Sequence, residues 1–191
     1  MKVIAINGSP RKDGNTANLI NRVLDELKQE GIETEIVHLS GKKIKGCIAC
    51  MKCMENADKH CAQKNDDVNE IIDKMVASNG IILGSPTYFA NVSTEMKAII
   101  DRSGLVCHAN GYMLKRKVGA AVVAVRRAGA IQVFDAINHF YFINQVIVPG
   151  SSYWNMGYGF DKNEVDNDEE GIQTMKHLGS NMAWLLKKIN T

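Results

Sequence analysis

The stretch KVIAINGSPRKDGNTANLI, residues 2–20, joins three segments of different character. Its first part, VIAI, is a continuous apolar run rich in β-branched side chains, which predicts a strand buried on both faces. Residues 8–14 are polar and contain two glycines and a proline, which predicts a tight loop. Apolar side chains then recur at helical spacing until Gly31, and Asn15 or Thr16 can cap this helix. The chain therefore begins with a buried strand, a polar loop and a helix.

The same alternation of strands and helices continues along the chain. Because strands that alternate with helices form parallel sheets covered on both faces, we expect an α/β fold with five parallel strands in a single domain over residues 1–191. The one interruption is a cysteine-rich loop at residues 44–66, before the second helix. The further strands are expected at 33–39, 80–85, 117–125 and 146–150, and the further helices from Asp66 or Asp67, from Ser93, at 130–144 and at 168–188.

Composition and charge narrow the class of protein. Of the 191 residues, 45% are hydrophobic and 23% are charged, which is ordinary for a globular protein. The net charge is +2 and the basic residues are scattered, so we expect neither a nucleic-acid partner nor a membrane partner. The first residues lack the apolar core of a signal peptide and the apolar runs are of strand length, which predicts a cytoplasmic protein. Thiols usually stay reduced there, so clustered cysteines indicate metal or redox chemistry rather than disulfides.

The loop at residues 8–14 is expected to bind an anion. In a doubly wound sheet, ligands bind past the carboxyl ends of the strands, and this loop leads into a helix N-terminus that favours negative charge. Ser9, Asn15 and Thr16 add side-chain donors, and the loop also contributes the cation of Arg11. The loop lacks GxxxxGK[ST] and GxGxxG, so a phosphate monoester held mostly by neutral donors fits better than a magnesium–nucleoside triphosphate. The alternative is a glycine-rich turn that only begins a capped helix.

A second loop, GSPTYFANVS at residues 84–93, follows the third predicted strand at the same edge of the sheet. Its PTYF segment, residues 86–89, makes a rigid turn with an aromatic surface. A flat heteroaromatic ring can lie against the backbone of such a turn, with its polar edge meeting main-chain N–H groups. The alternative is that Tyr88 and Phe89 only pack against a helix.

Together the two loops resemble those of the flavodoxin-like NAD(P)H-dependent FMN reductase superfamily. The resemblance rests on GSPRKDGNT after the first strand and GSPTYFANVSTEMKAIIDR after the third, and it covers most of the chain. It implies a flavodoxin-like doubly wound sheet with the strand order 2-1-3-4-5 and a bound FMN. The implied ligands of the FMN phosphate are Ser9, Arg11, Asn15 and Thr16. The implied contacts of the isoalloxazine ring are Pro86, Thr87, Tyr88, Phe89 and Asn91.

A third contact loop in this family follows the fourth strand, where the chain reads VRRAGA, residues 125–130. Arg126 and Gly129 are therefore further candidates for the flavin site. The pair Arg126 and Arg127 is not typical of that loop. These arginines either meet the phosphate of the cofactor or of an electron donor, or they form a solvated pair on the surface.

Four of the five cysteines fall within GCIACMKCMENADKHC, residues 46–61. They are separated by two, two and seven residues, and thiols at two-residue gaps cannot all pair in low-strain disulfides. Four thiolates suit a cubane [4Fe–4S] cluster or a tetrahedral zinc ion, and the continuous CxxCxxC favours the cluster because zinc sites usually join two separate hooks. Reduced thiols without a metal are the third interpretation. The candidate ligands are Cys47, Cys50, Cys53 and Cys61.

The same stretch resembles the compact cysteine motif of iron–sulfur flavoproteins, a branch of that superfamily. The resemblance implies a [4Fe–4S] cluster on these four cysteines, with a last gap of seven residues that is at the long end for the branch. His60 is either an alternative ligand to Cys61 or an exposed side chain. Cys107 is expected to be a half-buried side chain rather than a ligand.

Three functions are compatible with the sequence. The first is an FMN-dependent electron-transfer flavoprotein with a [4Fe–4S] cluster, which converts between two-electron and one-electron partners. The second is an NAD(P)H-dependent FMN or quinone reductase without a cluster, and the third is a non-catalytic flavodoxin-like module whose cysteines bind zinc. Flavin chemistry needs no acid–base set, and no catalytic residue is predicted. The expected partners are NAD(P)H or a ferredoxin-like electron donor, and a small-molecule or protein acceptor.

The resemblance also implies a homodimer or homotetramer with the flavin near a subunit boundary. The segment VPGSSYWNMGYGF, residues 148–160, is rich in aromatic side chains and too irregular for a helix. It is expected to cover a flavin, to form a subunit interface or to pack onto its own core.

Overall fold

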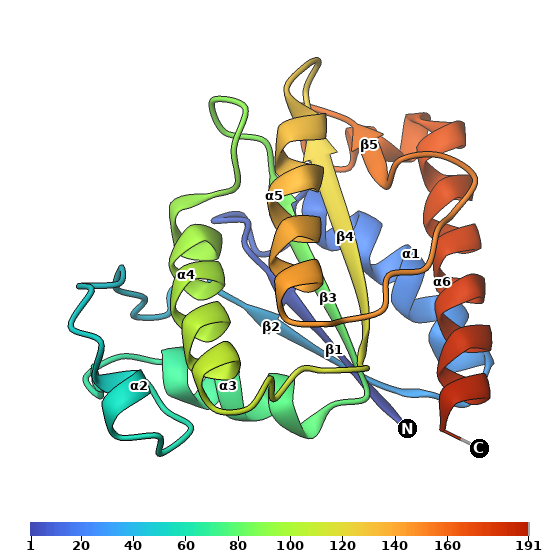
Figure 1. Ribbon diagram of the computed structural model, residues 1–191. Helices are drawn as coiled ribbons and strands as arrows, with labels where there is room; N and C mark the ends of the chain where they lie inside the picture. Colours follow the sequence, from blue (N-terminus) through green and yellow to red (C-terminus); the bar gives the residue numbers. More distant parts are fainter. Residues whose placement is uncertain (191) are drawn as a thin grey trace.

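The computed structural model describes residues 1–190. Its centre is a sheet of five parallel strands in the order β2-β1-β3-β4-β5, with helices on both faces (Figure 1). The predicted α/β fold and strand order are therefore confirmed. The strands are β1 (Lys2–Asn7), β2 (Glu33–His38), β3 (Gly80–Pro86), β4 (Val118–Val125) and β5 (Met156–Tyr158).

Two layers of helices cover the sheet. On one face α1 and α6 contribute buried side chains such as Leu19 and Leu178 to an apolar core. On the other face α3, α4 and α5 contribute to a second core, with Ile71 and Ile99 among its members. Within residues 1–190, no helix combines the length and the apolar character needed to cross a bilayer. The helices are α1 (Asn15–Gln29), α2 (Lys52–Glu55), α3 (Val68–Ala77), α4 (Thr94–Ala109), α5 (Ala130–Ile143), the 3₁₀ helix η1 (Glu164–Asn167) and α6 (Glu169–Ile189).

The helix starts follow the predicted capping residues with two differences. Ser93 caps α4 as expected, because its hydroxyl accepts the N–H of Met96. The N-cap of α1 is Gly14, so Asn15 is already the first helical residue rather than a cap. The second difference concerns α3, which has Asp67 at its N-cap position but no side-chain capping bond.

The prediction for the fifth strand is wrong in position. Residues 146–150 do not form a strand, although Ile147 makes one isolated parallel bridge to Val118 at the start of β4. Pro149 has no N–H to continue this pairing, and the chain leaves the sheet after the bridge. It returns at Met156, which pairs with Val123 near the end of β4. Two short segments therefore share the edge position next to β4.

The loops after β1 and β3 are bonded to each other. The N–H of Gly8 donates to the carbonyl of Gly84 at 2.8 Å, and the Ser93 hydroxyl donates to the carbonyl of Gly8 at 2.7 Å. A Cβ on Gly8 would lie only 2.9 Å from the Cβ of Met96, so only glycine allows this approach. The junction fixes the position of the first loop relative to the start of α4.

We predict that Ser93→Ala lowers the free energy of unfolding by about 1–3 kcal/mol, because it removes both the cap of α4 and the bond to Gly8. Chemical denaturation of Ser93→Ala and of Thr94→Ala, a truncation of the exposed neighbouring residue, measures the difference. Equal stability of the two variants would contradict a joining role for the Ser93 hydroxyl.

Candidate functional site

The loops after β1, β3 and β4 surround a hollow at the carboxyl edge of the sheet. The volume of this hollow is about 270 Å³. The predicted flavin residues that line it are Ser9, Arg11, Asn15, Thr16, Pro86, Thr87, Tyr88 and Arg126. Gly14, Ala124, Gly159 and Phe160 complete the lining. Three loops far apart in sequence therefore meet around one space.

The N-terminus of α1 opens into this hollow. Gly14 has no side chain to bond the N–H groups of the first turn, which consequently lack a capping acceptor. Thr16, in that first turn, is buried and also lines the hollow. The Ser9 hydroxyl accepts the N–H of Arg11 at 3.1 Å, which leaves its own proton free to donate. The arrangement suits an anion held mainly by neutral donors.

Two buried polar atoms in the lining have no partner within the chain. They are the Oδ1 of Asn15 and the Oγ1 of Thr87. Buried polar atoms normally have a hydrogen-bond partner, so two unpartnered atoms on residues that line a hollow indicate a ligand that supplies one. Asn15 can accept from a hydroxyl group, and Thr87 can donate to a carbonyl or ring nitrogen. A phosphorylated polyol carrying a heteroaromatic ring, such as FMN, has groups of each kind.

The segment at residues 159–161 packs over the first loop. Arg11 donates to the carbonyl of Phe160 at 3.2 Å, and Asn15 donates to the carbonyl of Asp161 at 2.9 Å. The N–H groups of Asp161 and Phe160 both donate to the Glu164 carboxylate, and these bonds lower the pKa of Glu164. This part of the segment 148–160 therefore packs on its own chain, at the rim of the hollow.

Arg126 stands on the other side of that rim. Its guanidinium carbon lies 4.8 Å from the centre of the Phe160 ring, a cation–π contact. Both arginines are exposed, but Arg126 lines the hollow from the β4 loop and Arg127 does not. Only Arg126 is therefore positioned to contact a ligand in this hollow.

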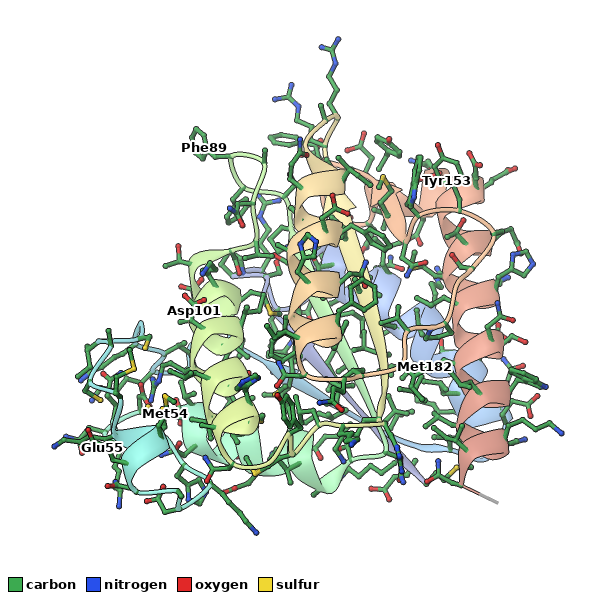
Figure 2. The ribbon with its side chains drawn as sticks, in the orientation of Figure 1. Met54, Glu55, Phe89, Asp101, Tyr153 and Met182 are labelled. Carbon is green, nitrogen blue, oxygen red and sulfur yellow. The ribbon has the colours of Figure 1, made fainter. Side chains whose placement is uncertain are left out.

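Three predicted flavin residues lie outside the lining. Phe89 is fully exposed at the tip of the loop between β3 and α4, where Figure 2 shows it pointing away from the molecule. Asn91 pairs through its backbone with Tyr88 and so closes the turn. Gly129 has φ +86°, and a Cβ there would lie 3.1 Å from Ala90. Asn91 and Gly129 therefore contact the loop between β3 and α4 but do not line the hollow.

Asn7, at the end of β1, holds the first loop in place through hydrogen bonds. The sequence analysis did not identify this residue. Its Oδ1 accepts the N–H of Ser9 at 3.0 Å, and its Nδ2 lies 3.0 Å from the Nδ1 of His38. Burial and the nearby charge of Lys12 lower the pKa of His38, which favours the neutral imidazole that can accept this bond. The sequence feature that could have identified Asn7 is its place as a polar residue at the end of the apolar run VIAI.

The four cysteines of residues 46–61 line a second, small hollow beside α4. Arg102, Leu105 and Val106 of α4 form its other wall. Cys53 and Cys61 are buried, Cys50 is half-buried and Cys47 is exposed, and none forms a disulfide. Among the described residues, no three metal-ligating side chains stand close enough together to hold a single metal ion. The four thiols nevertheless line one hollow, and four thiolates are a ligand set for a metal centre.

The backbone of this loop is strained. Four of its non-glycine residues have left-handed φ angles between 49° and 66°, a conformation that such residues rarely adopt. Strain of this kind clusters at ligand sites, where the surrounding structure enforces it. Figure 2 shows Met54 and Glu55 on this loop, at the side of the molecule away from Tyr153. The strained residues are Ala49, Met51, Ala57 and Lys59.

Helices α3 and α4 hold the loop in place through side chains that the sequence analysis missed. Asn69 of α3 exchanges two hydrogen bonds with the backbone of Cys61, at 2.8 and 2.9 Å. Asn110 donates to the carbonyl of Cys53 at 3.2 Å. Burial raises the pKa of the Cys53 thiol, and the nearby thiols of Cys61 and Cys50 add to the effect.

Two other predictions concern single residues of this region. His60 does not line the cysteine hollow and instead pairs with Asp73 at 2.8 Å. Cys107 is fully buried rather than half-buried, and burial raises the pKa of its thiol to about 12. Cys107 lies in the core beneath α4 and does not line the cysteine hollow.

The fold and the position of the first hollow define a flavodoxin-like α/β protein. A family model described as "NADPH-dependent FMN reductase" matches residues 1–161. The chain belongs to this family and, within it, to the iron–sulfur flavoproteins. The resemblance expected from the two loops and the cysteine motif is therefore confirmed.

Full-length relatives support this assignment. The chain is 39% identical to an iron–sulfur flavoprotein of Methanocaldococcus jannaschii, over 99% of each chain. It is 35% identical to an iron–sulfur flavoprotein of Methanosarcina thermophila, over 99% of this chain and 97% of the relative.

Solved structures show the same fold at low identity. One is the protein RosB with a bound 8-demethyl-8-formylriboflavin-5'-phosphate, which is 18% identical with a TM-score of 0.80 and covers 100% of this chain and 80% of that one. Another is a flavodoxin from the domain Archaea, which is 14% identical with a TM-score of 0.64 and covers 98% of this chain and 99% of that one.

Proposed function

We propose that the protein is an FMN-dependent oxidoreductase that transfers electrons through FMN and an iron–sulfur cluster. The observation that carries the proposal is that α4 joins both hollows. Its N-terminus continues the loop that lines the first hollow, and its second half forms a wall of the cysteine hollow. Family membership supports FMN in the first site, and the names of the full-length relatives support iron and sulfur in the second.

In the first hollow we assign the FMN phosphate to Ser9, Arg11, Thr16 and the N–H groups of the first turn of α1. Asn15 accepts from a hydroxyl of the ribityl chain, because its Oδ1 has no other partner. The isoalloxazine ring lies against the turn at 86–88, where the Thr87 hydroxyl donates to it. FMN, when bound, exchanges a hydride or single electrons, and the residues here position it and shield it from water.

In the second hollow we assign a [4Fe–4S] cluster to Cys47, Cys50, Cys53 and Cys61. The continuous CxxCxxC spacing favours a cluster over a zinc ion, because zinc sites usually join two separate hooks. A cluster gives and takes one electron at a time. Together with FMN it would let the protein couple a two-electron partner to a one-electron partner. The clusterless NAD(P)H-dependent reductase and the zinc-binding module are the competing functions.

The surface of the cysteine loop supports a protein as one of the electron partners. Six lysines lie within residues 42–64, and among residues 1–190 none of their ammonium groups forms an ion pair. Ile48, Met51 and Met54 are exposed between them. A basic surface with an apolar centre suits an acidic one-electron carrier of the ferredoxin-like kind, whereas NAD(P)H would reduce the flavin directly.

The rate of electron transfer from an acidic carrier should therefore fall as ionic strength rises. Stopped-flow reduction at increasing salt measures this. NAD(P)H is the comparison donor, because it would reduce the flavin directly and needs no contact with the lysines. A salt-independent rate would contradict docking on the lysines.

Cytoplasmic location and a homodimer or homotetramer are further parts of the proposal. Exposed aromatic side chains at Tyr153, Trp154 and Tyr158 support assembly, and light scattering that shows a monomer would exclude it.

The proposal as a whole is tested by a UV–visible spectrum of protein purified without oxygen, with iron and zinc determined on the same sample. We expect flavin bands over a broad absorbance that dithionite bleaches, with about four irons per chain. Flavin bands without iron, together with rapid NAD(P)H oxidation, would instead establish the clusterless reductase. Zinc at one per chain with little flavin would establish the third function.

Replacement of Asn15 and Thr16 together by alanine should weaken FMN binding by about tenfold or more, since the Thr16 bond to the charged phosphate contributes about 1.5–3 kcal/mol and the Asn15 bond to a neutral hydroxyl about 0.5–1.5 kcal/mol. The Thr16→Ala single variant should weaken FMN binding but leave riboflavin binding unchanged, because riboflavin has no phosphate. Fluorescence titration of apoprotein with both flavins measures this, and Asn21→Ala, an exposed change on the same helix, is the matched control. Equal losses for both flavins would place the phosphate elsewhere.

A further inference from the structure

The cysteine hollow contains a buried arginine that flavin binding does not use. Arg102 of α4 has no exposed side-chain surface, and neither has the carboxylate of Asp66 with which it pairs. Both η nitrogens of Arg102 donate to this carboxylate, so the acid is engaged on two sides. Burial alone would raise the pKa of Asp66, but the bonds and charge of Arg102 lower it, which keeps the pair ionised.

The guanidinium also holds both ends of the cysteine loop. One η nitrogen donates to the carbonyl of Lys45, before the first cysteine, at 3.0 Å. The other donates to the carbonyl of Gln63, after the last cysteine, at 3.0 Å. A planar group with donors in a fixed fork can make such contacts on several sides at once, which a lysine ammonium cannot. Arg102 therefore fixes the entry and the exit of the loop against α4.

The remaining donor of Arg102 points at sulfur. Its Nε lies 3.3 Å from the Sγ of Cys61, within hydrogen-bond range for a sulfur acceptor. The η nitrogens face Asp66, so the positive end of the ion pair is turned toward the thiol and the negative end away from it. Cys47, in contrast, accepts only the backbone N–H of Ala49, at 3.4 Å. Among the four candidate ligands of the described chain, Cys61 alone has a charged side-chain donor on its sulfur.

We propose that Arg102 is a positioning residue that sets the reduction potential of the cluster and holds the cysteine loop ready to receive it. A reduced cluster carries one more electron than an oxidised one. An N–H donor and a positive charge beside a ligand sulfur stabilise that added charge, so they raise the potential. The inference rests on the proposed cluster at Cys47–Cys61 and concerns how this chain tunes it.

The experiment compares cluster midpoint potentials in holoprotein by anaerobic redox titration followed by electron paramagnetic resonance. Arg102→Met alone would leave Asp66 as an unpaired buried charge and risks unfolding. The double variant Arg102→Met/Asp66→Leu removes both charges together. We expect its cluster potential to shift to more negative values while the FMN potential stays unchanged. A cluster potential equal to or above that of the wild type in this variant would overturn the proposal.

Two further variants separate tuning from anchoring. Asp66→Asn keeps an amide oxygen that can accept from Arg102, whose guanidinium also retains the carbonyls of Lys45 and Gln63, so the cation keeps hydrogen-bond acceptors. The variant keeps the donor on Cys61 but removes the compensating negative charge, so we expect a shift to more positive values. Asn110→Ala removes another anchor of the loop without touching a sulfur, so it should lower iron retention but leave the potential unchanged. If the double variant does not take up iron, Asp66→Asn decides alone, and an unchanged or more negative potential there overturns the proposal. Wild-type protein that binds no iron would refute the proposed function itself, which is a different result.

Discussion

The parallel pairing of β1 with β3 is the constraint on which the first hollow depends. It runs from Val3 opposite Gly80 to Asn7 opposite Gly84, and β3 continues only to Pro86, so the two strands end at the same edge of the sheet. The loops that follow must then share one small region of the sheet edge. Glycine at position 8 and the hydroxyl of Ser93 let them meet without a clash. A shift of one residue in this register would separate the donors of α1 from the turn at 86–88 and dissolve the hollow.

Helix α4 connects the junction of these two loops to the cysteine loop. Its first residue follows the cap that is bonded to Gly8, and its later turns present Arg102 and then Asn110 to the loop. Figure 1 shows α4 between the cysteine loop and the sheet. Both candidate cofactor sites are therefore positioned by the same helix, α4. The length of this helix fixes the distance between the two sites. An α-helix is well suited to this role because its length follows from a constant rise of about 1.5 Å per residue.

Much of this arrangement was predictable from local sequence. The first loop was found because polar donors follow directly on a buried strand, and the cysteines because their spacing is unusual. The pair Asp66 and Arg102 was not, since its members lie 36 positions apart in the sequence and only the folded chain brings them together. Asp66 even looked like a helix cap, which is the commoner local use of aspartate at such a position.

The error in the fifth strand has the same origin. Residues 146–150 have the composition of a strand, but the residues that pair with the end of β4 begin at Met156, and this long-range pairing is not visible in the local sequence. The role of residues 159–161 beside Arg11 likewise depends on a contact across 149 positions of the chain. Patterns within a window of about ten residues cannot report such contacts, whereas they did report the helices and the inner strands.

The divided edge next to β4 has a consequence for how the protein behaves when crowded. A long, flat edge strand offers a continuous row of free N–H and C=O groups to which a neighbouring molecule can add a strand. Here one bridge at Ile147 and three residues at Met156–Tyr158 occupy the two ends of that row, and the chain between them is turned out of the sheet. The opposite edge, β2, carries the charged side chains of Glu33 and Glu35. The charged residues of β2 and the divided edge next to β4 both disfavour the addition of a strand by a neighbouring molecule, which is the first step of fibrillar aggregation.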